Sequence, residues 1–161
     1  MTKTPKSDTV TEVMTPNTHE EIFGSFEPVS MPRLGIKDTI AKIDTGAYSG
    51  AMHCSMIEEA VREDGKKVLR FVASDNRGQV TEVEKYAVTQ VRSSTGHEVK
   101  RYLFDTTIVI RQKSYSIRIG LSDRSDMRYE ILIGRRFLRE NNILVDVRIN
   151  QELDTDGGIQ S

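Results

Sequence analysis

Residues 41–54, AKIDTGAYSGAMHC, are the least ordinary part of this sequence. Apolar and polar residues alternate up to Ile43, as is typical of a strand, and the strand ends on Asp44, Thr45 and Gly46. This ending is compatible with an ordinary turn. It can also present a carboxylate held by backbone N–H groups and a hydroxyl, since Gly46 lets the backbone approach closely. One carboxylate is rarely a complete catalytic site, so the question is where a second acid comes from.

The composition indicates one water-soluble domain and a cytoplasmic location. The chain has 161 residues, of which 29% are charged and 37% hydrophobic, so it can bury a core without disulfides. No segment approaches the roughly 18 apolar residues of a membrane span, and the start of the chain lacks the apolar region of a secretory signal. We therefore expect no membrane partner. Cys54 is the only cysteine, which fits a reducing compartment.

The formal net charge of -1 hides an uneven distribution, because both ends are acidic and the middle is positive. Such a middle region can favour an acidic partner, although a solvated face is the simpler interpretation. The basic stripe interleaved with aromatic residues that single-stranded nucleic acid requires is missing, so no nucleic acid partner is expected. Several of the positive charges are close together in sequence: Arg124, Arg128, Arg135, Arg136 and Arg139.

Strand patterns dominate the chain between two unpatterned ends. We predict a flexible arm over 1–21, one domain over 22–149 and a flexible acidic tail over 150–161. Arg135 to Glu140 form the one convincing helix, which Asn141 and Asn142 can end. Many short strands with one brief helix predict an all-β barrel or sandwich. Strands are expected around residues 68–72, 80–91, 99–110, 115–121 and 143–147, with turns at 74–78 and 93–96.

Metal and thiol chemistry have weak support in the sequence. Neither His19 nor His97 has a second histidine four residues later, as a zincin helix requires. His53 beside Cys54 is a candidate ligand pair without obvious companions. Cys54 with a histidine could act as a nucleophile, but a small cysteine after a strand is more often a packing residue. No Walker loop is present. We expect no metal and no cofactor.

The segment from Ala41 to Ala47 resembles the active-site segment of the retropepsin-like aspartic proteases, in which an alternating strand leads into Asp-Thr-Gly-Ala. A second mark of that family lies downstream, where Ile131-Leu132-Ile133-Gly134-Arg135 resembles its apolar run and Gly-Arg before a short helix and a last strand. Two marks in this order are much more specific than one. The resemblance implies a closed or partly open acid-protease barrel with one short C-terminal helix.

A bacterial branch of this group, RimB-like and formerly called ATP-dependent zinc protease, is similar over roughly residues 22 to 148. The branch is linked by association to RimK-type ATP-grasp ligases, which makes such a ligase a candidate partner. The older name has no support here, since neither a zinc motif nor an ATP loop is found. The matching motifs are Gly24-x-x-Glu27 and residues 31–36, 91–96, 121–129, 132–135 and 144–146.

The resemblance implies that the second carboxylate is Asp44 of another chain in a homodimer. One Asp44 carboxylate would act as general base on a water between the two, and the protonated one would polarise the scissile carbonyl. Thr45 would brace the two loops, Gly46 would donate its N–H towards a carboxylate, and Ala47 would line the substrate floor. Five residues would pack beneath the loop and support it: Ile131, Leu132, Ile133, Gly134 and Arg135. Arg135 would do so through an ion pair.

A second acid from the same chain is the rival interpretation. Asp123 and Asp126 lie in a turn-like segment, where capping of the turn is their simpler role. Because the resemblance extends through this segment, Asp123 and Arg124 are also candidates for substrate contact. The hairpin around residues 75–78 is the candidate flap.

The expected function is therefore aspartic endopeptidase activity on a peptide or protein. An acidic substrate is compatible with the positive charge of the middle region. Two alternatives stay open. One is a non-proteolytic peptide-binding or processing partner of an ATP-grasp peptide ligase. The other is the zinc-dependent protease of the older name.

Overall fold

The computed structural model of the chain describes residues 21–73, 79–92, 95–123 and 127–155, and most of these residues lie in strands. No helix in these ranges is long and apolar enough to span a membrane. The strands are β1 (Glu21–Phe23), β2 (Phe26–Met31), β3 (Ile36–Asp44), β4 (Gly50–Val61), β5 (Lys67–Ala73), β6 (Val80–Val83), β7 (Ala87–Arg92), β8 (Glu98–Ile110), β9 (Lys113–Ser122), β10 (Ile131–Gly134) and β11 (Ile143–Val145). The helical elements are α2 (Arg135–Glu140) and the short 3-10 turns η2 (Pro32–Leu34) and η3 (Gln151–Leu153).

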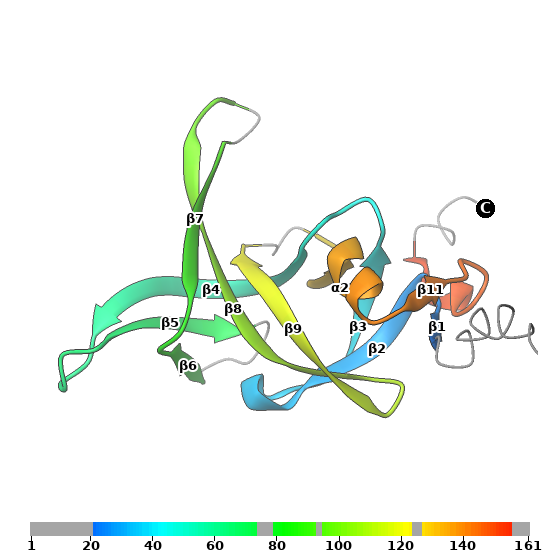
Figure 1. Cartoon of the computed structure of the whole chain (residues 1–161), viewed down its shortest axis with the longest axis horizontal. Coiled ribbons are helices and arrows are strands. Elements are labelled where there is room, and N and C mark those ends of the chain that lie inside the picture. Colours follow the sequence, from blue (N-terminus) through cyan, green and yellow to red (C-terminus); the bar gives the residue numbers. More distant parts are fainter. Residues whose placement is uncertain (1–20, 74–78, 93–94, 124–126, 156–161) are drawn as a thin grey trace, which may run out of the picture.

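Six strands close into a barrel, which confirms the predicted all-β class with one short helix (Figure 1). β10 closes the ring because it pairs in parallel with β3 and antiparallel with β4. The ring continues from β4 through β9, β8 and β2 back to β3. Successive side chains of a strand lie on opposite faces, so alternate residues of each strand point into the barrel.

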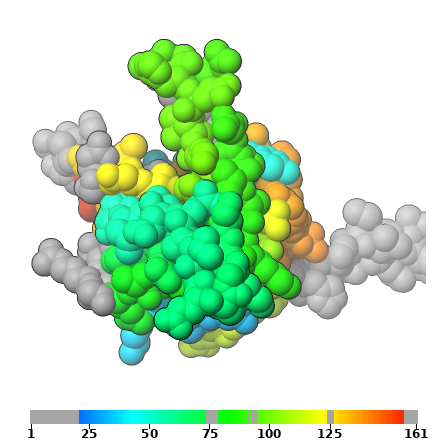
Figure 2. All heavy atoms as spheres, turned by 90° about the vertical axis from the view of Figure 1, so that its left-hand side faces the viewer, coloured from blue at the N-terminus to red at the C-terminus, as the bar shows by residue number. Residues whose placement is uncertain are grey.

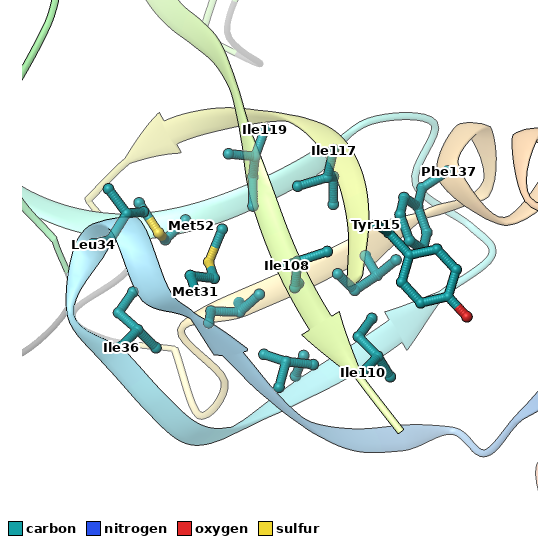
Figure 3. Packing of buried hydrophobic residues seen from close by; sticks show 14 of the residues in the cluster. Met31, Leu34, Ile36, Met52, Ile108, Ile110, Tyr115, Ile117, Ile119 and Phe137 are labelled. Atoms are coloured by element: carbon teal, nitrogen blue, oxygen red, sulfur yellow. The ribbon is translucent and has the colours of Figure 1, made fainter. Parts of the chain in front are cut away.

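The barrel encloses one hydrophobic core (Figure 3). Met31 and Leu34 enter it from the segment before β3, and Met52 enters from β4. Ile108 and Ile119 enter it from β8 and β9 and are fully buried. Helix α2 covers one end of the core, where the Phe137 ring packs edge-on against Tyr115.

Two long hairpins extend away from the barrel (Figure 1). The first is formed by β4 and β5, and β6 adds a third strand to it. The second is formed by β7 and the first half of β8, and β7 has no other partner in the described chain. The single strand predicted over 80–91 is therefore wrong. Its two halves, β6 and β7, belong to different hairpins, so the chain must break between them.

The ends of the domain meet in a small parallel sheet of β1 and β11. The contacts of the fold continue past Ile149, where the domain was predicted to end: Asn150 donates to the Phe26 carbonyl at 2.8 Å, and the Tyr129 hydroxyl donates to the Leu153 carbonyl at 2.8 Å. Most of the predicted arm and the last part of the predicted tail lie outside the described residues.

Candidate active site

The turn after β3 holds the Asp44 carboxylate. The Gly46 N–H donates to Asp44 Oδ1 at 2.9 Å, and the Ala47 N–H donates to the Asp44 carbonyl at 3.2 Å. Asp44 is half-buried, whereas Thr45 and Gly46 are exposed. The local sequence therefore presents one carboxylate on a backbone-braced turn at the end of a barrel strand.

Strand β10 lies directly beside this turn. Its register places Ile133 opposite Ile43 and Gly134 opposite Asp44. A Cβ atom at Gly134 would lie 2.5 Å from the Tyr48 carbonyl oxygen, so the turn can pass over this position only because it is glycine. Ile131 and Ile133 point into the core, while Leu132 is half-exposed on the other face.

Arg135 fixes the turn from the first position of α2. Its Nη1 atom donates to the Gly46 carbonyl at 3.1 Å and to the Thr45 carbonyl at 3.4 Å. The guanidinium also lies over the Tyr48 ring, 5.5 Å from the ring centroid. Arg135 was expected to form an ion pair. Among the described residues it binds backbone carbonyls instead of an acidic side chain. Removal of Arg135 would loosen the turn that carries Asp44.

Strand alternation identifies the residues that lie next to Asp44 on the outer face of the barrel. Lys42 precedes Asp44 by two residues and shares its face, because Ala41 and Ile43 are buried in the core. Leu132 lies opposite Lys42 and also opposite Ala51, and Ala51 lies opposite Gly120. This continuous outer face, from Lys42 through Leu132 and Ala51 to Gly120, is called the Asp44 face below.

Asp123 does not lie beside Asp44. Its Oδ1 atom lies 3.7 Å from Nδ1 of the buried His53. Gly120 on β9 and Leu132 on β10 lie at the same level of the sheet, because both are paired with Ala51. Asp123 lies three residues from this level on one side, and Asp44 lies two residues from it on the other side. The two acids are therefore about 16 Å apart along the sheet, at about 3.3 Å per residue. Asp123 is not the second acid of an Asp44 pair, and both Arg124 and Asp126 lie outside the described residues.

The hairpin around residues 75–78, the candidate flap, lies outside the described residues as well. Hairpin β7–β8 instead projects freely from the barrel in both views (Figures 1 and 2). The sequence did signal this hairpin through its turn residues at 93–96, but gave no indication that the ribbon would stand clear of the barrel. Arg101, at the base of this hairpin, was not singled out from the sequence.

The side chains of the candidate zinc ligands His53 and Cys54 point to opposite faces of the barrel wall. Consecutive strand residues point to opposite faces: Cys54 lies in the core cluster and His53 faces Asp123. Burial, with the nearby Asp123 charge, raises the pKa of the Cys54 thiol to about 12, so the thiolate nucleophile is disfavoured. Within the described ranges, no three His, Cys, Asp or Glu side chains come close enough to share a metal ion.

The retropepsin-like class of folds is defined by a closed barrel with an Asp-Thr-Gly turn. A second apolar strand that ends in Gly-Arg, together with a short helix, braces this turn. The family model described as "Retropepsin-like aspartic endopeptidase RimB" matches residues 22–152. The chain belongs to this RimB-like family.

The chain is also similar to a solved structure and to part of several named proteins. A solved structure of the Legionella pneumophila protein Lpg0085, of unknown function, superposes with a TM-score of 0.64 at 28% identity, covering 80% of this chain and 95% of that one. Proteins named "Probable alpha-L-glutamate ligase" also match: that of Parasynechococcus marenigrum is 29% identical over 140 residues, 84% of this chain. That of Desulfotalea psychrophila is 27% identical over 130 residues, 78% of this chain. The matched segments are 30% and 28% of those ligases, so the chain spans less than a third of their length.

Proposed function

We propose that the chain is an aspartic endopeptidase whose active site forms between two copies of itself. The observation that carries this proposal is the Asp44 turn: one oriented, half-buried carboxylate lies at the edge of the Asp44 face. Asp123, the same-chain rival, lies about 16 Å away along the sheet. A two-fold axis beside the turn would supply the missing acid as the same residue of the partner, an isologous arrangement.

The chemistry follows from two carboxyl groups that face each other across this axis. Two carboxylates about 3 Å apart cannot both ionise cheaply, so the pair shares one proton. The ionised carboxylate takes a proton from a water held between them, and that water attacks the scissile carbonyl. The protonated carboxyl donates its hydrogen bond to the carbonyl oxygen, which gains negative charge during the attack.

The β1–β11 sheet supports a dimer because it carries an apolar surface. Ile22, Leu144 and Val147 are exposed by 47%, 50% and 69% of their surface and gather around a shallow hollow of about 450 Å³. Contiguous exposed apolar residues of this kind are typical of protein interfaces. We propose that a second copy covers this surface, and that hairpin β7–β8 serves as the flap over bound peptide.

Replacement of Asp44 is the direct test of this function. Asp44→Asn keeps the size and hydrogen-bonding shape of the side chain but cannot act as a base, so we expect peptide cleavage to fall by at least about 10²-fold, as for loss of a general base. Asp38→Asn is the matched control, since Asp38 is an exposed acid on the same strand. Turnover by Asp44→Asn equal to that of the wild type would refute the proposal. Loss of activity on incubation with EDTA would favour the zinc enzyme instead.

A second candidate function rests on the relatives named as alpha-L-glutamate ligases, which contain a segment similar to most of this chain. In this alternative the chain is a peptide-binding or processing partner of such an ATP-grasp ligase. Size-exclusion chromatography of the chain with a purified ligase tests it. Complex formation that survives Asp44→Asn, without any peptide cleavage by the wild type, would favour the binding role over the protease.

A further inference from the structure

The two long hairpins share no backbone pairing in the described chain where they leave the barrel. Strand β9 ends at Ser122, and beyond this end β8 pairs only with β7 among the described residues. In the same way, β4 beyond His53 pairs only with β5 in the part of the chain that the structure describes. Figure 1 shows that the hairpins then diverge, β4–β5 to the left and β7–β8 upwards. The angle between them is therefore not set by a continuous sheet.

Packing fills the space between the two hairpin bases only in part. A cavity of about 350 Å³ lies there, with Ile57 of β4 on one side and Val99 and Tyr102 of β8 on the other. Leu121, near the end of β9, lines it as well. Because close-packed protein interiors leave few voids larger than a water molecule, a cavity of this size means that apolar packing supports the β7–β8 hairpin incompletely on this side.

One carboxylate joins the two hairpins. The Tyr86 hydroxyl, from the residue before β7, donates to Glu59 Oε2 at 2.7 Å, and the Tyr102 hydroxyl of β8 donates to Glu59 Oε1 at 3.3 Å. Glu59 itself lies on β4, opposite Leu69 of β5. Hydrogen bonds to an ionised carboxylate are stronger than those between neutral groups. These three residues, Glu59, Tyr86 and Tyr102, are called the Glu59 cluster below.

The charges around the Glu59 cluster keep its hydrogen bonds formed at neutral pH. Lys67 of β5 and Lys100 of β8 each place their Nζ atom 3.9 Å from the carboxylate. The Tyr86 hydrogen bond and the Lys67 charge hold the pKa of Glu59 below its ordinary value, against the opposing effect of burial. Burial raises the pKa of Tyr86 to about 12, so its hydroxyl remains a donor. Both lysines are more than half exposed, so the hydroxyls fix the geometry more than the ion pairs do.

We propose that Glu59 is a positioning residue that holds the β7–β8 hairpin at one angle to the barrel through its hydrogen bonds to Tyr86 and Tyr102. This inference rests on the proposed function, in which the hairpin is the flap over bound peptide, and it adds the group that fixes the flap. Glu59 lies on the projecting part of β4, away from the Asp44 turn, so it acts only through the hairpin. Without the cluster, the hairpin samples several angles, and only part of the population is ready to cover a peptide.

The angle of the hairpin can be measured without any activity. Spin labels are attached at Glu63→Cys, in the turn of hairpin β4–β5, and at Gln90→Cys on β7, which are both exposed positions, in a Cys54→Ala background. Pulsed electron spin resonance then gives the distribution of distances between the two labels. We expect this distribution to become about twofold wider in Glu59→Leu, because the hairpin then populates more than one angle.

Further variants separate the hydrogen bonds from the charge and from the packing. Glu59→Gln keeps an oxygen that accepts from both hydroxyls, so the distribution should stay close to that of the wild type. Tyr86→Phe keeps the ring but removes the shorter hydrogen bond, so it should widen the distribution more than Tyr102→Phe does. Glu58→Leu is the matched control, because Glu58 is an exposed glutamate next to Glu59 that lies outside the Glu59 cluster.

Three results would overturn the inference. The first is the same distance distribution in the wild type and in Glu59→Leu. The second is an unchanged distribution in the double variant Tyr86→Phe/Tyr102→Phe, which folds with both rings in place. The third is a widening by Glu58→Leu as large as that by Glu59→Leu, since any loss of charge on this strand would then have the same effect.

Kinetics separate this inference from the proposed function. If the wild type cleaves peptide, Glu59→Leu should raise KM about fivefold with kcat little changed, because fewer molecules hold the hairpin ready, and Glu59→Gln should keep KM near that of the wild type. A wider distribution in Glu59→Leu, in a protein that cleaves nothing, would support the positioning role and refute the peptidase. Cleavage by the wild type, with unchanged label distances in Glu59→Leu, would support the peptidase and refute the positioning role.

Discussion

At the scale of single residues, the orientation of Asp44 comes from backbone groups and, within the described part of the chain, not from other side chains. The Gly46 N–H binds one carboxylate oxygen, and Gly134 leaves space for the turn to cross β10. Because the strand pattern and the Asp-Thr-Gly motif are both local, the sequence alone could place this turn. Lys42 is different: the alternation of β3 puts it on the face of Asp44, but only the tertiary structure shows that no described acidic residue forms an ion pair with it there.

Cys54 provides a prediction at the same scale. Its thiol is buried, and its pKa is raised from the usual 9.0 to about 12. We expect iodoacetamide to label native protein far more slowly than protein unfolded in urea, as mass spectrometry can measure. Since the folded-state pKa is raised, this group stabilises the fold below pH 9 and the contribution is lost as the pH rises towards 12. Cys54→Ala should keep full peptidase activity. Rapid labelling of native protein, or an inactive Cys54→Ala, would point to a catalytic thiol instead.

At the scale of elements, the sequence predicted those parts whose pattern is local. The helix occurs as expected at Arg135–Glu140, and Asn142 adopts a φ of 54°, as its role in ending the helix requires. The break between β6 and β7 could not be predicted, because it depends on two hairpins that pair with different partners. The β1–β11 sheet joins segments more than a hundred residues apart, which no short sequence window contains.

The turn between β8 and β9 is tied to the rest of the barrel by a buried ion pair. Arg111 and Gln112 have φ angles of 53° and 69°, which non-glycine residues adopt at some cost. Arg111 Nη2 and Nε donate to Glu27 Oε2 at 2.9 and 3.0 Å, and the Gly24 N–H donates to the same oxygen at 2.7 Å. Glu27 is 2% exposed. This pair anchors a strained turn to β2.

Removal of the two partners should have unequal effects. Arg111→Met leaves a buried carboxylate without its counter-charge, so we expect the free energy of unfolding in urea to fall by about 3–5 kcal/mol. Glu27→Gln leaves Arg111 partly exposed to water and should lower it by only about 1–2 kcal/mol. The double variant should resemble Glu27→Gln alone. A larger effect of Glu27→Gln than of Arg111→Met would contradict the assignment of the buried carboxylate as the costly partner.

At the scale of the whole molecule, the β1–β11 surface is predicted to join two copies. Leu144→Lys and Val147→Lys place a charge on exposed apolar positions, so the fold should persist while the interface loses its apolar contact. Sedimentation equilibrium should show a shift towards monomer, and peptidase activity should fall with it. Val61→Lys is the matched control, since Val61 is 68% exposed on the remote β4–β5 hairpin. Full activity in a monomeric Val147→Lys would place the complete active site within one chain.

The most direct test of a shared active site is to mix wild-type chains with inactive chains. Wild-type protein is unfolded and refolded with a ninefold excess of Asp44→Asn, and cleavage per wild-type chain is measured. If each site needs Asp44 from two chains, random pairing leaves about one tenth of the wild-type chains with a wild-type partner, so activity falls to about a tenth. An excess of Asp44→Asn that also carries Val147→Lys should inhibit much less. Activity per wild-type chain that does not change with any excess of Asp44→Asn would show that one chain holds the whole site.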